Sequence, residues 1–318
     1  MIKSIKGALM GVFVGDASGA TLELMYGERT EEEAKVAMKM LGGGKSNVGP
    51  GQITDDSELA ICLAWALQDG YDINKIALSY NKWYNSEPLD MGNTCKAAFK
   101  GTTSKEMIEL SLKFNMKSES NGALMRIVPL AIYASQFDND TLLIKLTSED
   151  AQLSHPNPIT VDCNILYSLA IAYLIRHSGD NTGCLAYLDD KLKQININNT
   201  VRQWYKDSAA DNLNNIVNAL HNIGHVKHAF ILSFYYLRKK TEFTTAIKET
   251  LMRGGDTDTN AAIVGGMMGA LHGYDAIPEA LKMAVLEFDC CANGIRKRPD
   301  FVSAKHFDKL VSILVKQK

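Results

Sequence analysis

The sequence predicts an all-α fold, a single compact domain of many short helices over residues 1–318. Apolar residues recur at helical spacing along nearly the whole chain, whereas the alternating pattern of strands is nearly absent. Proline is rare, with 7 residues, and no flexible linker divides the chain into two cores. The composition, 46% hydrophobic and 22% charged, supplies enough apolar side chains for a large core.

The helical spacing predicts helices in eleven segments. They span 3–15, 55–69, 73–85, 121–134, 141–153, 158–177, 211–222, 226–239, 243–252, 258–272 and 277–288. The runs "LAICLAWAL" and "AIVGGMMGAL" are apolar on more than one face, so helices 55–69 and 258–272 are expected to be central. The run "RTEEEAKVAMK" is typical of a solvated helix face, residues 178–210 are expected at the periphery, and residues 289–318 are expected as a C-terminal extension.

Glycines recur every four residues in two of these helices. The first series runs from Gly7 to Gly19 and the second from Gly265 to Gly273, so each series lies on one helix face. An interior glycine costs a helix roughly 1 kcal/mol relative to alanine, so repeated use on one face predicts another backbone at close range. We therefore expect both helices in the core, each packed closely along its glycine ridge. Loosely helical glycine-rich turns are the alternative.

The charge and cysteine patterns exclude several classes of protein. With 34 basic and 36 acidic residues, a net charge of −2, the chain shows no sign of nucleic-acid binding or of a solvating acidic tail. The apolar run at the N-terminus is broken by glycines and leads into Asp16, and the later run "HAFILSFYYL" is too short to span a bilayer. The six cysteines are scattered without a CxxC spacing, which predicts reduced thiols. We expect a cytoplasmic protein, taken to be a monomer, without a nucleic-acid or membrane partner.

Two acidic clusters stand at the start of apolar helices. They supply six oxygen-bearing side chains, those of Thr54, Asp55, Asp56, Asp256, Asp258 and Thr259. Helix capping explains one acid per helix, as in Asp55 followed by Glu58, but it does not explain two. Neighbouring carboxylates repel unless cations neutralise them, and hard divalent cations prefer carboxylate, hydroxyl and water oxygens. The clusters therefore predict a two-metal site with water positions left open.

Other acidic motifs and covalent catalysis fit the sequence less well. An EF-hand that begins at Asp256 would need glycine and glutamate where the chain has Ala261 and Met267. The "DDSEL" segment lacks the fifth-position acid of the isoprenoid synthases, which also pair acidic motifs with Mg²⁺. No GxSxG motif marks a serine nucleophile, so a covalent intermediate is disfavoured.

Six short motifs follow one another along the chain. They are "GALMGVFVGDASGATLE" (7–23), "GQITDD" (51–56), "DMGNT" (90–94), "SNGALMRIVPL" (120–130), "LSHPNP" (153–158) and "GGDTDT" (254–259). Each is weak alone, but in this order and spacing they resemble the ADP-ribosylglycohydrolase family. That family includes the dinitrogenase-reductase-activating glycohydrolase and the ADP-ribosylarginine and ADP-ribosylserine hydrolases. The resemblance runs to about residue 275 and implies an all-α fold with a binuclear Mg²⁺ or Mn²⁺ centre.

The resemblance also implies roles for individual residues. The six oxygen-bearing residues of the two clusters would hold two Mg²⁺ or Mn²⁺ ions, and Glu23 would bind or gate one ion or assist catalysis. Asp90 and Asn93 would line the pocket near the scissile bond. The diphosphate of ADP-ribose would meet Ser120, Asn121, Gly122 and His155. A glycine at position 122 would let backbone amides approach phosphate oxygens closely.

The reaction that the resemblance implies is hydrolysis at C1 of the distal ribose, which releases ADP-ribose from a modified acceptor. Asp55, Asp56 or Glu23 would accept the proton of the attacking water, and Asp90 would position or protonate an arginine leaving group. The motifs look closer to the arginine-directed members, so a protein arginine is the expected acceptor. Two kinds of alternative stay open. The substrate could be serine-linked ADP-ribose, O-acetyl-ADP-ribose or poly(ADP-ribose), or the protein could be an inactive ADP-ribose-binding pseudoenzyme or have a structural role.

Three features depart from the family pattern or lie outside it. His225, in "GHV", takes the place of a tyrosine that faces the nucleotide in many relatives, and it is expected to bind the adenosine side. Asp16 is either a helix-end acid or a support of the site. The run "RKRP", residues 296–299, is expected to be a solvated basic turn, with contact to the substrate phosphates as the alternative.

Overall fold

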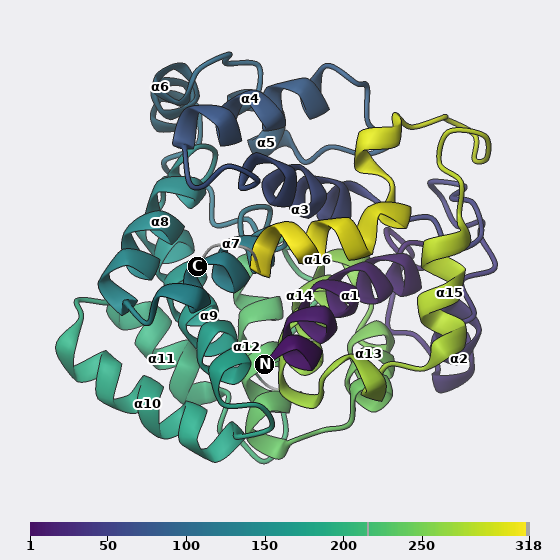
Figure 1. Ribbon diagram of the computed structural model, residues 1–318. Helices are drawn as coiled ribbons and strands as arrows, with labels where there is room; N and C mark the ends of the chain where they lie inside the picture. The colour runs from purple at the N-terminus through teal and green to yellow at the C-terminus, as the bar shows by residue number, and fades with distance from the viewer. Residues whose placement is uncertain (215, 316–318) are drawn as a thin grey trace.

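Residues 1–214 and 216–315 are described in the computed structural model, and they fold into helices and loops without a strand (Figure 1). The first half contains α1 (Ile2–Gly19), α2 (Glu31–Ala37), α3 (Asp55–Ala66), α4 (Ile73–Tyr84), α5 (Asn93–Ala98), α6 (Ser104–Phe114), α7 (Val128–Ala134) and α8 (Asp140–Gln152). The second half contains α9 (Pro158–Arg176), α10 (Asn181–Gln194), α11 (Asn199–Asp207), α12 (Val226–Lys239), α13 (Phe243–Met252), α14 (Thr257–His272), α15 (Glu279–Glu287) and α16 (Phe307–Val315). Four 3₁₀ helices are η1 (Ser135–Phe137), η2 (Tyr274–Ala276), η3 (Asp300–Val302) and η4 (Ala304–His306). The predicted all-α class and single domain are confirmed.

One of the expected helices, 121–134, is only half as long as predicted, and another, 211–222, is wrong. Residues 121–127 form turns, and α7 begins only at Val128, with Pro129 in its first turn, where proline is favoured. The described part of 211–222 is irregular, and residue 215 lies outside the described residues. There the side-chain oxygens of Asn212 and Asn218 accept hydrogen bonds from backbone amides two residues further on, and such local bonds compete with a helix.

Five helices that the sequence analysis did not expect are α5, α6, α10, α11 and α16. Three of them begin at a residue whose side chain caps the first turn, namely Thr103, Asp180 and Asn198. Their apolar stripes are narrow, so the spacing of apolar residues gave little signal, whereas the caps were readable. The peripheral position expected for residues 178–210 agrees with α10 and α11, which lie at the lower edge of the molecule in Figure 1.

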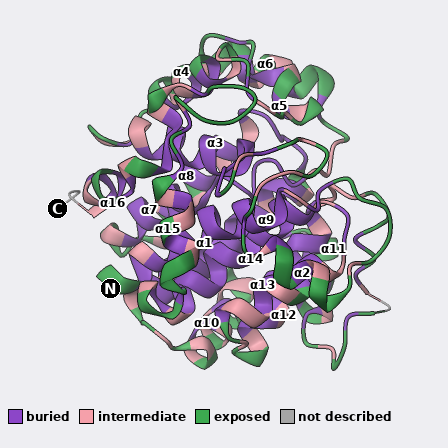
Figure 2. Ribbon diagram, turned by 90° about the vertical axis from the view of Figure 1, so that its right-hand side faces the viewer, coloured by how far each residue is buried: buried purple, intermediate pink, exposed green. Residues whose placement is uncertain are grey.

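The core is built around three helices that are buried on nearly all sides. In α1 and α14 almost every residue is buried, in α9 most residues are, and Figure 2 shows these helices as the purple interior. By length and composition alone, α9 resembles a membrane span, but 78% of its apolar window is buried inside the molecule. It is therefore the kind of apolar helix that a large protein core requires.

The glycine ridges of α1 and α14 pack directly against each other. A Cβ placed on Gly11 would lie 2.0 Å from the carbonyl oxygen of Gly265, and one on Gly265 would lie 2.1 Å from that of Gly11. The same reciprocal contact joins Gly7 and Gly269. The two backbones therefore touch, and no larger residue fits between them. The expected burial and close packing are confirmed, except that Gly273 follows the end of α14 with φ of +80°.

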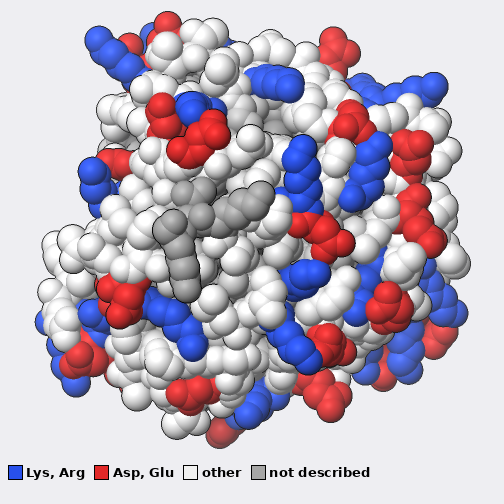
Figure 3. Space-filling view, in the orientation of Figure 1, with Lys and Arg blue, Asp and Glu red and all other residues white. Residues whose placement is uncertain are grey.

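The C-terminal segment returns to the body of the fold. The helix α16 packs against α1, α3 and α7, and the Phe307 ring lies edge-on to the Phe13 ring with centroids 6.2 Å apart. Figure 3 shows lysine, arginine, aspartate and glutamate side chains interspersed on the visible face, without a large patch of one sign.

The close α1–α14 contact yields the first prediction. Gly11→Ala should lower the free energy of unfolding by about 3 kcal/mol, because the added methyl overlaps the Gly265 carbonyl. Helix propensity alone would give the opposite sign, a gain of about 1 kcal/mol. Urea unfolding followed by circular dichroism measures the difference.

Gly92→Ala is the matched control for Gly11→Ala. A Cβ on Gly92 meets nothing within 4 Å, and the Gly92 φ of −57° suits alanine. Its effect should stay within about 0.5 kcal/mol. A stabilised Gly11→Ala protein would show that the two backbones are not in contact.

Candidate active site

A cavity of about 580 Å³ opens where the predicted motifs meet. All but three of the residues singled out from the sequence line it. These lining residues are Glu23, Asp55, Asp90, Asn93, Ser120, Asn121, Gly122, His155, Asp256, Asp258 and Thr259. They come from segments more than 200 positions apart in the chain, so the fold gathers them into one place. Thr54 and Asp56 are buried outside the lining, and His225 lies in an adjoining hollow.

The contact between α1 and α14 brings the first and last motifs together. Beyond the glycine ridge, a Cβ on Gly19 would lie 2.4 Å from the Cα of Asp258. The hydroxyl of Thr257 donates a hydrogen bond of 2.9 Å to the carbonyl oxygen of Gly19. Glu23 follows within one turn, and its amide donates to the same carbonyl at 3.2 Å. The last turn of the first motif is thereby fixed on the first turn of α14.

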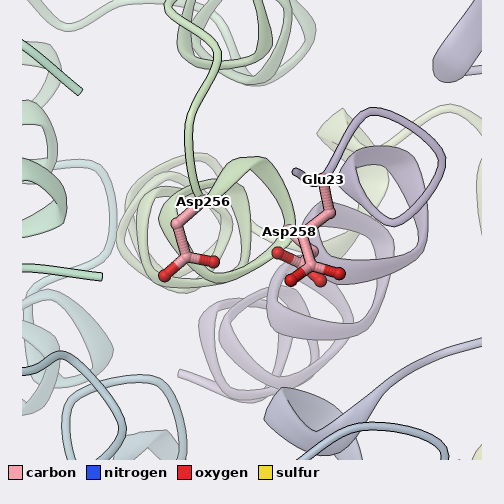
Figure 4. Close-up of side chains that lie close together, drawn as sticks. All are labelled: Glu23, Asp256 and Asp258. Carbon is pink, nitrogen blue, oxygen red and sulfur yellow. The ribbon is translucent and has the colours of Figure 1, made fainter. Parts of the chain in front are cut away.

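Three carboxylates from these two motifs form a cluster. Glu23, Asp256 and Asp258 each place one oxygen within 4.8 Å of the others, as the close-up in Figure 4 shows. Burial raises the pKa of Glu23 to about 8, and the charges of Asp256 and Asp90 add to the shift. Burial, followed by the charge of Glu23, holds the pKa of Asp258 well above its ordinary value. The cluster therefore concentrates negative charge in a poorly solvated place.

The second acidic motif is held at the start of α3 by Asp16. Its carboxylate accepts hydrogen bonds from the amides of Thr54 and Ser57 and from the Thr54 hydroxyl, at 2.8 to 3.1 Å. Burial raises the pKa of Asp16 to about 6. Asp16 thus caps α3 from another helix, and Thr54, which precedes α3, makes no capping bond itself. Of the two roles left open for Asp16, the structure gives the supporting one.

The acidic residues fit a hard cation. Asp56 Oδ1 is buried and has no hydrogen-bond partner among residues 1–214 and 216–315, while its Oδ2 accepts from the Thr54 hydroxyl at 3.1 Å. Among the described residues, no lysine or arginine forms an ion pair with the five acids Glu23, Asp55, Asp56, Asp256 and Asp258. Burial and the neighbouring acids raise the pKa of Asp55 and Asp56 well above the ordinary value. Unpaired buried carboxylates are costly, and a divalent cation with oxygen ligands would offset that cost.

The loop Ser120–Gly122 forms another part of the cavity lining. Asn121 ties this loop to the acidic side, because its Nδ2 donates a hydrogen bond of 2.7 Å to Asp256 Oδ2. A Cβ on Gly122 would lie 3.1 Å from His155 Cε1 and 3.2 Å from Cys95 Sγ. The sequence analysis expected glycine there for the approach of phosphate. The structure adds that a Cβ at this position would press on His155 and Cys95, which would have to move by a few tenths of an ångström.

His155 is fully buried and joins this wall to a chain of polar groups. Its Nδ1 lies 2.7 Å from Ser154 Oγ and its Nε2 lies 2.9 Å from Ser120 Oγ. Arg126 Nη1 donates to Ser154 Oγ at 2.9 Å, so the Ser154 hydroxyl is left to donate to Nδ1. Burial and the charge of Arg126 hold the pKa of His155 well below 6.5, so the ring is neutral. The network therefore assigns the proton to Nε2, which donates to Ser120 and turns the serine hydroxyl proton away from the ring.

Arg126 is the residue at this wall that the sequence analysis missed. It is fully buried, its Nη1 also donates to the carbonyl oxygen of Gly122 at 2.9 Å, and its Nη2 lies 3.3 Å from Asp150 Oδ2. Tyr80 completes the arrangement by accepting from Arg126 Nε at 3.1 Å. An arginine inside the apolar run "GALMRIVPLAI" was the available signal, because arginine is seldom fully buried without a specific partner.

His225 does not line the main cavity. It borders an adjoining hollow that shares Ser120 and Gly224 with it. The His225 Nε2 lies 3.0 Å from Glu119 Oε2, and the ring meets Trp204 edge-on with centroids 5.6 Å apart. Burial lowers the pKa of His225 against the effect of Glu119.

Comparison with known proteins agrees with these motifs. A family model described as ADP-ribosylglycohydrolase matches residues 2–308. A protein of Acanthamoeba polyphaga mimivirus that carries the name ADP-ribosyl glycohydrolase is 32% identical over 88% of this chain and 90% of its own length. An ADP-ribosyl-dinitrogen-reductase glycohydrolase of Rhodospirillum rubrum is 28% identical over 86% of each chain, and an ADP-ribosylarginine hydrolase of Pseudomonas putida (strain GB-1) is 26% identical over 86% of this chain and 71% of its own. A solved structure described as an ADP-ribosylglycohydrolase-related protein complex shares the fold, with a TM-score of 0.76 and 22% identity over 99% of this chain and 98% of that one.

The crowding of carboxylates yields the second prediction. Without divalent metal, Asp258→Asn should melt about 2 °C or more above the unaltered protein, because the change removes a carboxyl group whose ionisation is opposed in the folded state by burial and by the neighbouring acids, while it is free to ionise in the unfolded chain. Adding MgCl₂ or MnCl₂ should raise the melting temperature of the unaltered protein and have little effect on the variant. Differential scanning calorimetry at pH 7 with and without EDTA measures both.

Glu287→Gln is the control for the loss of one negative charge, since Glu287 is exposed and forms no ion pair among the described residues. It should leave both the melting temperature and the response to metal unchanged. An Asp258→Asn protein that melts below the unaltered one in EDTA would contradict the repulsion argued here.

Proposed function

The chain belongs to the ADP-ribosylglycohydrolase family and is a glycohydrolase by that membership, and we propose that it releases ADP-ribose from an ADP-ribosylated arginine of a protein. The observation that carries the proposal is the cavity itself. Its lining combines acids that have no ion-pair partner among the described residues with the Ser120 hydroxyl and the backbone of the loop 120–122. A pocket of about 580 Å³ lies in the range usual for small-molecule sites, so it suits the ADP-ribosyl group.

Two Mg²⁺ or Mn²⁺ ions are the cofactors that we propose. The residues that would hold them are Thr54, Asp55, Asp56, Asp256, Asp258 and Thr259. Glu23 belongs to the same set by position, because its carboxyl group lies with those of Asp256 and Asp258. When bound, such ions lower the pKa of a coordinated water and orient the hydroxyls of the ribose. The unpartnered Asp56 Oδ1 supports a cation on the α3 side of the site.

The hydrolysis needs a group that takes a proton from water. A bond forms between the water oxygen and C1 of the distal ribose, the C1–N bond to the acceptor breaks, and the leaving nitrogen gains a proton. Glu23, Asp55 or Asp56 would accept the proton of the water. All three lie at the acidic wall or directly behind it, and burial raises the pKa of each, which strengthens each carboxylate as a base.

Asp90 is the residue that we propose for the leaving group. It lines the cavity yet is exposed, so it stands at the opening, through which the acceptor side chain would enter. A carboxylate there can accept two hydrogen bonds from a guanidinium group, and this pairing favours arginine over serine as the acceptor. Asn93 lies on the same stretch of wall and would contact the ribose.

The diphosphate would lie against Ser120, Asn121 and Gly122. With Nε2 of neutral His155 donating to Ser120 Oγ, the serine hydroxyl donates its proton to Thr94 Oγ1 at 3.1 Å, and a phosphate oxygen in the cavity would take the place of that acceptor. His225 would contact the adenosine side from the adjoining hollow. His155 thus acts on the phosphate through Ser120.

The substrate partner that we propose is the modified protein, without a nucleic acid or a membrane. The relatives named for dinitrogen reductase and for ADP-ribosylarginine support a protein arginine as the acceptor. The described cysteines form no disulfide, and five of the six are buried, which supports the proposed cytoplasmic location. We keep the monomer as the proposed state. The complete set of candidate ligands disfavours an inactive pseudoenzyme.

The third prediction tests the activity. The protein should release free ADP-ribose from an arginine-ADP-ribosylated protein with Mg²⁺ or Mn²⁺ present, and EDTA should abolish the release. The double variant Asp55→Ala/Asp56→Ala should lose at least about a thousandfold in kcat/KM, since it removes two proposed ligands and two candidate bases. Chromatographic detection of ADP-ribose measures the rate.

Serine-linked and O-acetyl-ADP-ribose substrates are tested beside the arginine-linked one. Faster release from either would overturn arginine as the acceptor and keep the hydrolase. Binding of ADP-ribose without release from any substrate would replace the enzyme with a binding protein.

The fourth prediction concerns the phosphate wall. His155→Ala should weaken ADP-ribose binding by about thirtyfold, because Ser120 loses the donor to its oxygen that leaves its own hydroxyl proton free to turn from Thr94 to a charged ligand. Isothermal titration calorimetry measures the affinity. His177→Ala, which changes an exposed histidine at the end of α9, is the control and should bind normally. Equal affinities for the two variants would remove His155 from the substrate site.

A further inference from the structure

The loop that carries Asp90 has few hydrogen bonds of its own. It joins α4, which ends at Tyr84, to α5, which begins at Asn93. Among the described residues, positions 87–91 take part in no backbone–backbone hydrogen bond. Glu87 in this loop has φ of +52°, a left-handed conformation that is unfavourable for a residue with a Cβ. Something other than the loop backbone must therefore keep this conformation.

Two arginines from the C-terminal segment bind this loop. Arg296 Nη1 donates to the carbonyl oxygens of Glu87 and Pro88 at 3.2 and 2.9 Å. Arg298 Nη1 donates to the carbonyl oxygen of Ser86 at 2.6 Å, and its Nη2 donates to Ser86 Oγ at 2.8 Å. The prediction that the run 296–299 is a solvated basic turn is therefore wrong for Arg298, because this residue is only 2% exposed. Neither arginine lines the cavity, so the alternative of phosphate contact is not supported either.

Arg298 also fixes this contact to the helix of the second acidic motif. Its Nε and Nη2 form a two-pronged ion pair with Glu58, at 2.8 and 2.9 Å, and Glu58 is itself 2% exposed. Glu58 lies one turn beyond Asp55 in α3. The Trp83 ring nitrogen donates to the same carboxylate at 2.7 Å. The ion pair thus sets the distance between α3 and the loop that follows α4.

We infer that Arg296 and Arg298 are positioning residues, which hold the loop 86–92 so that Asp90 stays at a fixed place relative to the acids of α3. The inference rests on the proposed role of Asp90. The inference assigns a role to the segment 289–303, which lies beyond the motifs that identify the family. The carbonyl oxygens of positions 86, 87 and 88 receive three guanidinium hydrogen bonds within four residues of Asp90. Charge-assisted bonds of this kind are stronger and more directional than neutral ones.

Arg296→Ala is the informative change. Arg298→Ala would leave the buried Glu58 without its partner and would endanger folding. Arg296 is exposed, so its removal should leave the melting temperature unchanged. The matched control is Lys297→Ala, which removes an exposed positive charge from the adjacent position without touching the loop 86–92.

Hydrogen exchange followed by mass spectrometry tests the positioning without any substrate. The loop has two hydrogen-bonded amides, since Ser86 N donates to the Trp83 carbonyl oxygen and Met91 N donates to Asp90 Oδ1. These two amides should exchange faster in Arg296→Ala than in the unaltered protein, whereas Lys297→Ala and peptides from α14 should show no change. Equal exchange of the loop in the two variants would overturn the inference, whatever the enzyme does.

Kinetics then test whether the positioning matters for the proposed reaction. Arg296→Ala should lower kcat by about tenfold, with the affinity for ADP-ribose unchanged, because a small displacement of a reacting group is costly. In an Asp90→Asn background, Arg296→Ala should cause no further loss. A full additional loss in that background would overturn the inference and leave the proposed function in place.

The two failures can be told apart. If the unaltered protein hydrolyses no ADP-ribosyl substrate, the proposed function fails, and the exchange experiment still decides whether the arginines hold the loop. If Asp90→Asn turns over normally, the role of Asp90 fails and the inference fails with it, while the hydrolase stands.

Discussion

The direct contact between the backbones of α1 and α14 is the constraint on which the rest of the structure depends. Glycine at Gly11 and Gly265 lets the helices approach until a single added methyl would overlap a carbonyl oxygen. The same approach continues to Gly19 and the start of α14, so Glu23 and Asp258 come within a few ångströms of each other. The glycines weaken each helix, and the burial of both helices in a large core offsets that loss.

The acidic site then sets requirements for everything around it. Buried carboxylates without counter-charges oppose folding, so each must be held in place by its surroundings. Asp16 fixes the start of α3, Asn121 fixes Asp256, and Arg126 orders the wall across the cavity through Ser154 and His155. The side chains that hold the site in place are polar and buried, while carboxylates that face the cavity have no ion-pair partner among the described residues. Such a division allows a site to be rigid and still ready for a ligand.

The sequence was informative wherever a local rule controlled the outcome. Apolar spacing located the central helices, the glycine series predicted close packing, and the paired acids in "GQITDD" and "GGDTDT" proved to be neighbours in space. The sequence did not reveal features whose conformation depends on a residue far away in the chain. Nothing near Arg298 in the chain indicates that Glu58, 240 positions away, will pair with it. Likewise, the turns at 121–127 begin where the Asn121 amide donates to the carbonyl oxygen of Gly224, about 100 positions away, which the spacing of apolar residues does not reveal.

The failures share a physical cause that bears on the site. Helix propensity and apolar spacing describe how an element forms, whereas the position of a loop depends on side chains that reach it from elsewhere. Asp90 belongs to the second kind, since its own loop has no backbone ladder and relies on guanidinium groups near the far end of the chain. Motifs within residues 7–259 are thus enough to identify the chemistry, but they do not hold all the groups that the chemistry needs. The proposed position of Asp90 therefore depends on the C-terminal segment, through the bonds of Arg296 and Arg298 to its loop, although every proposed ligand comes from the motifs.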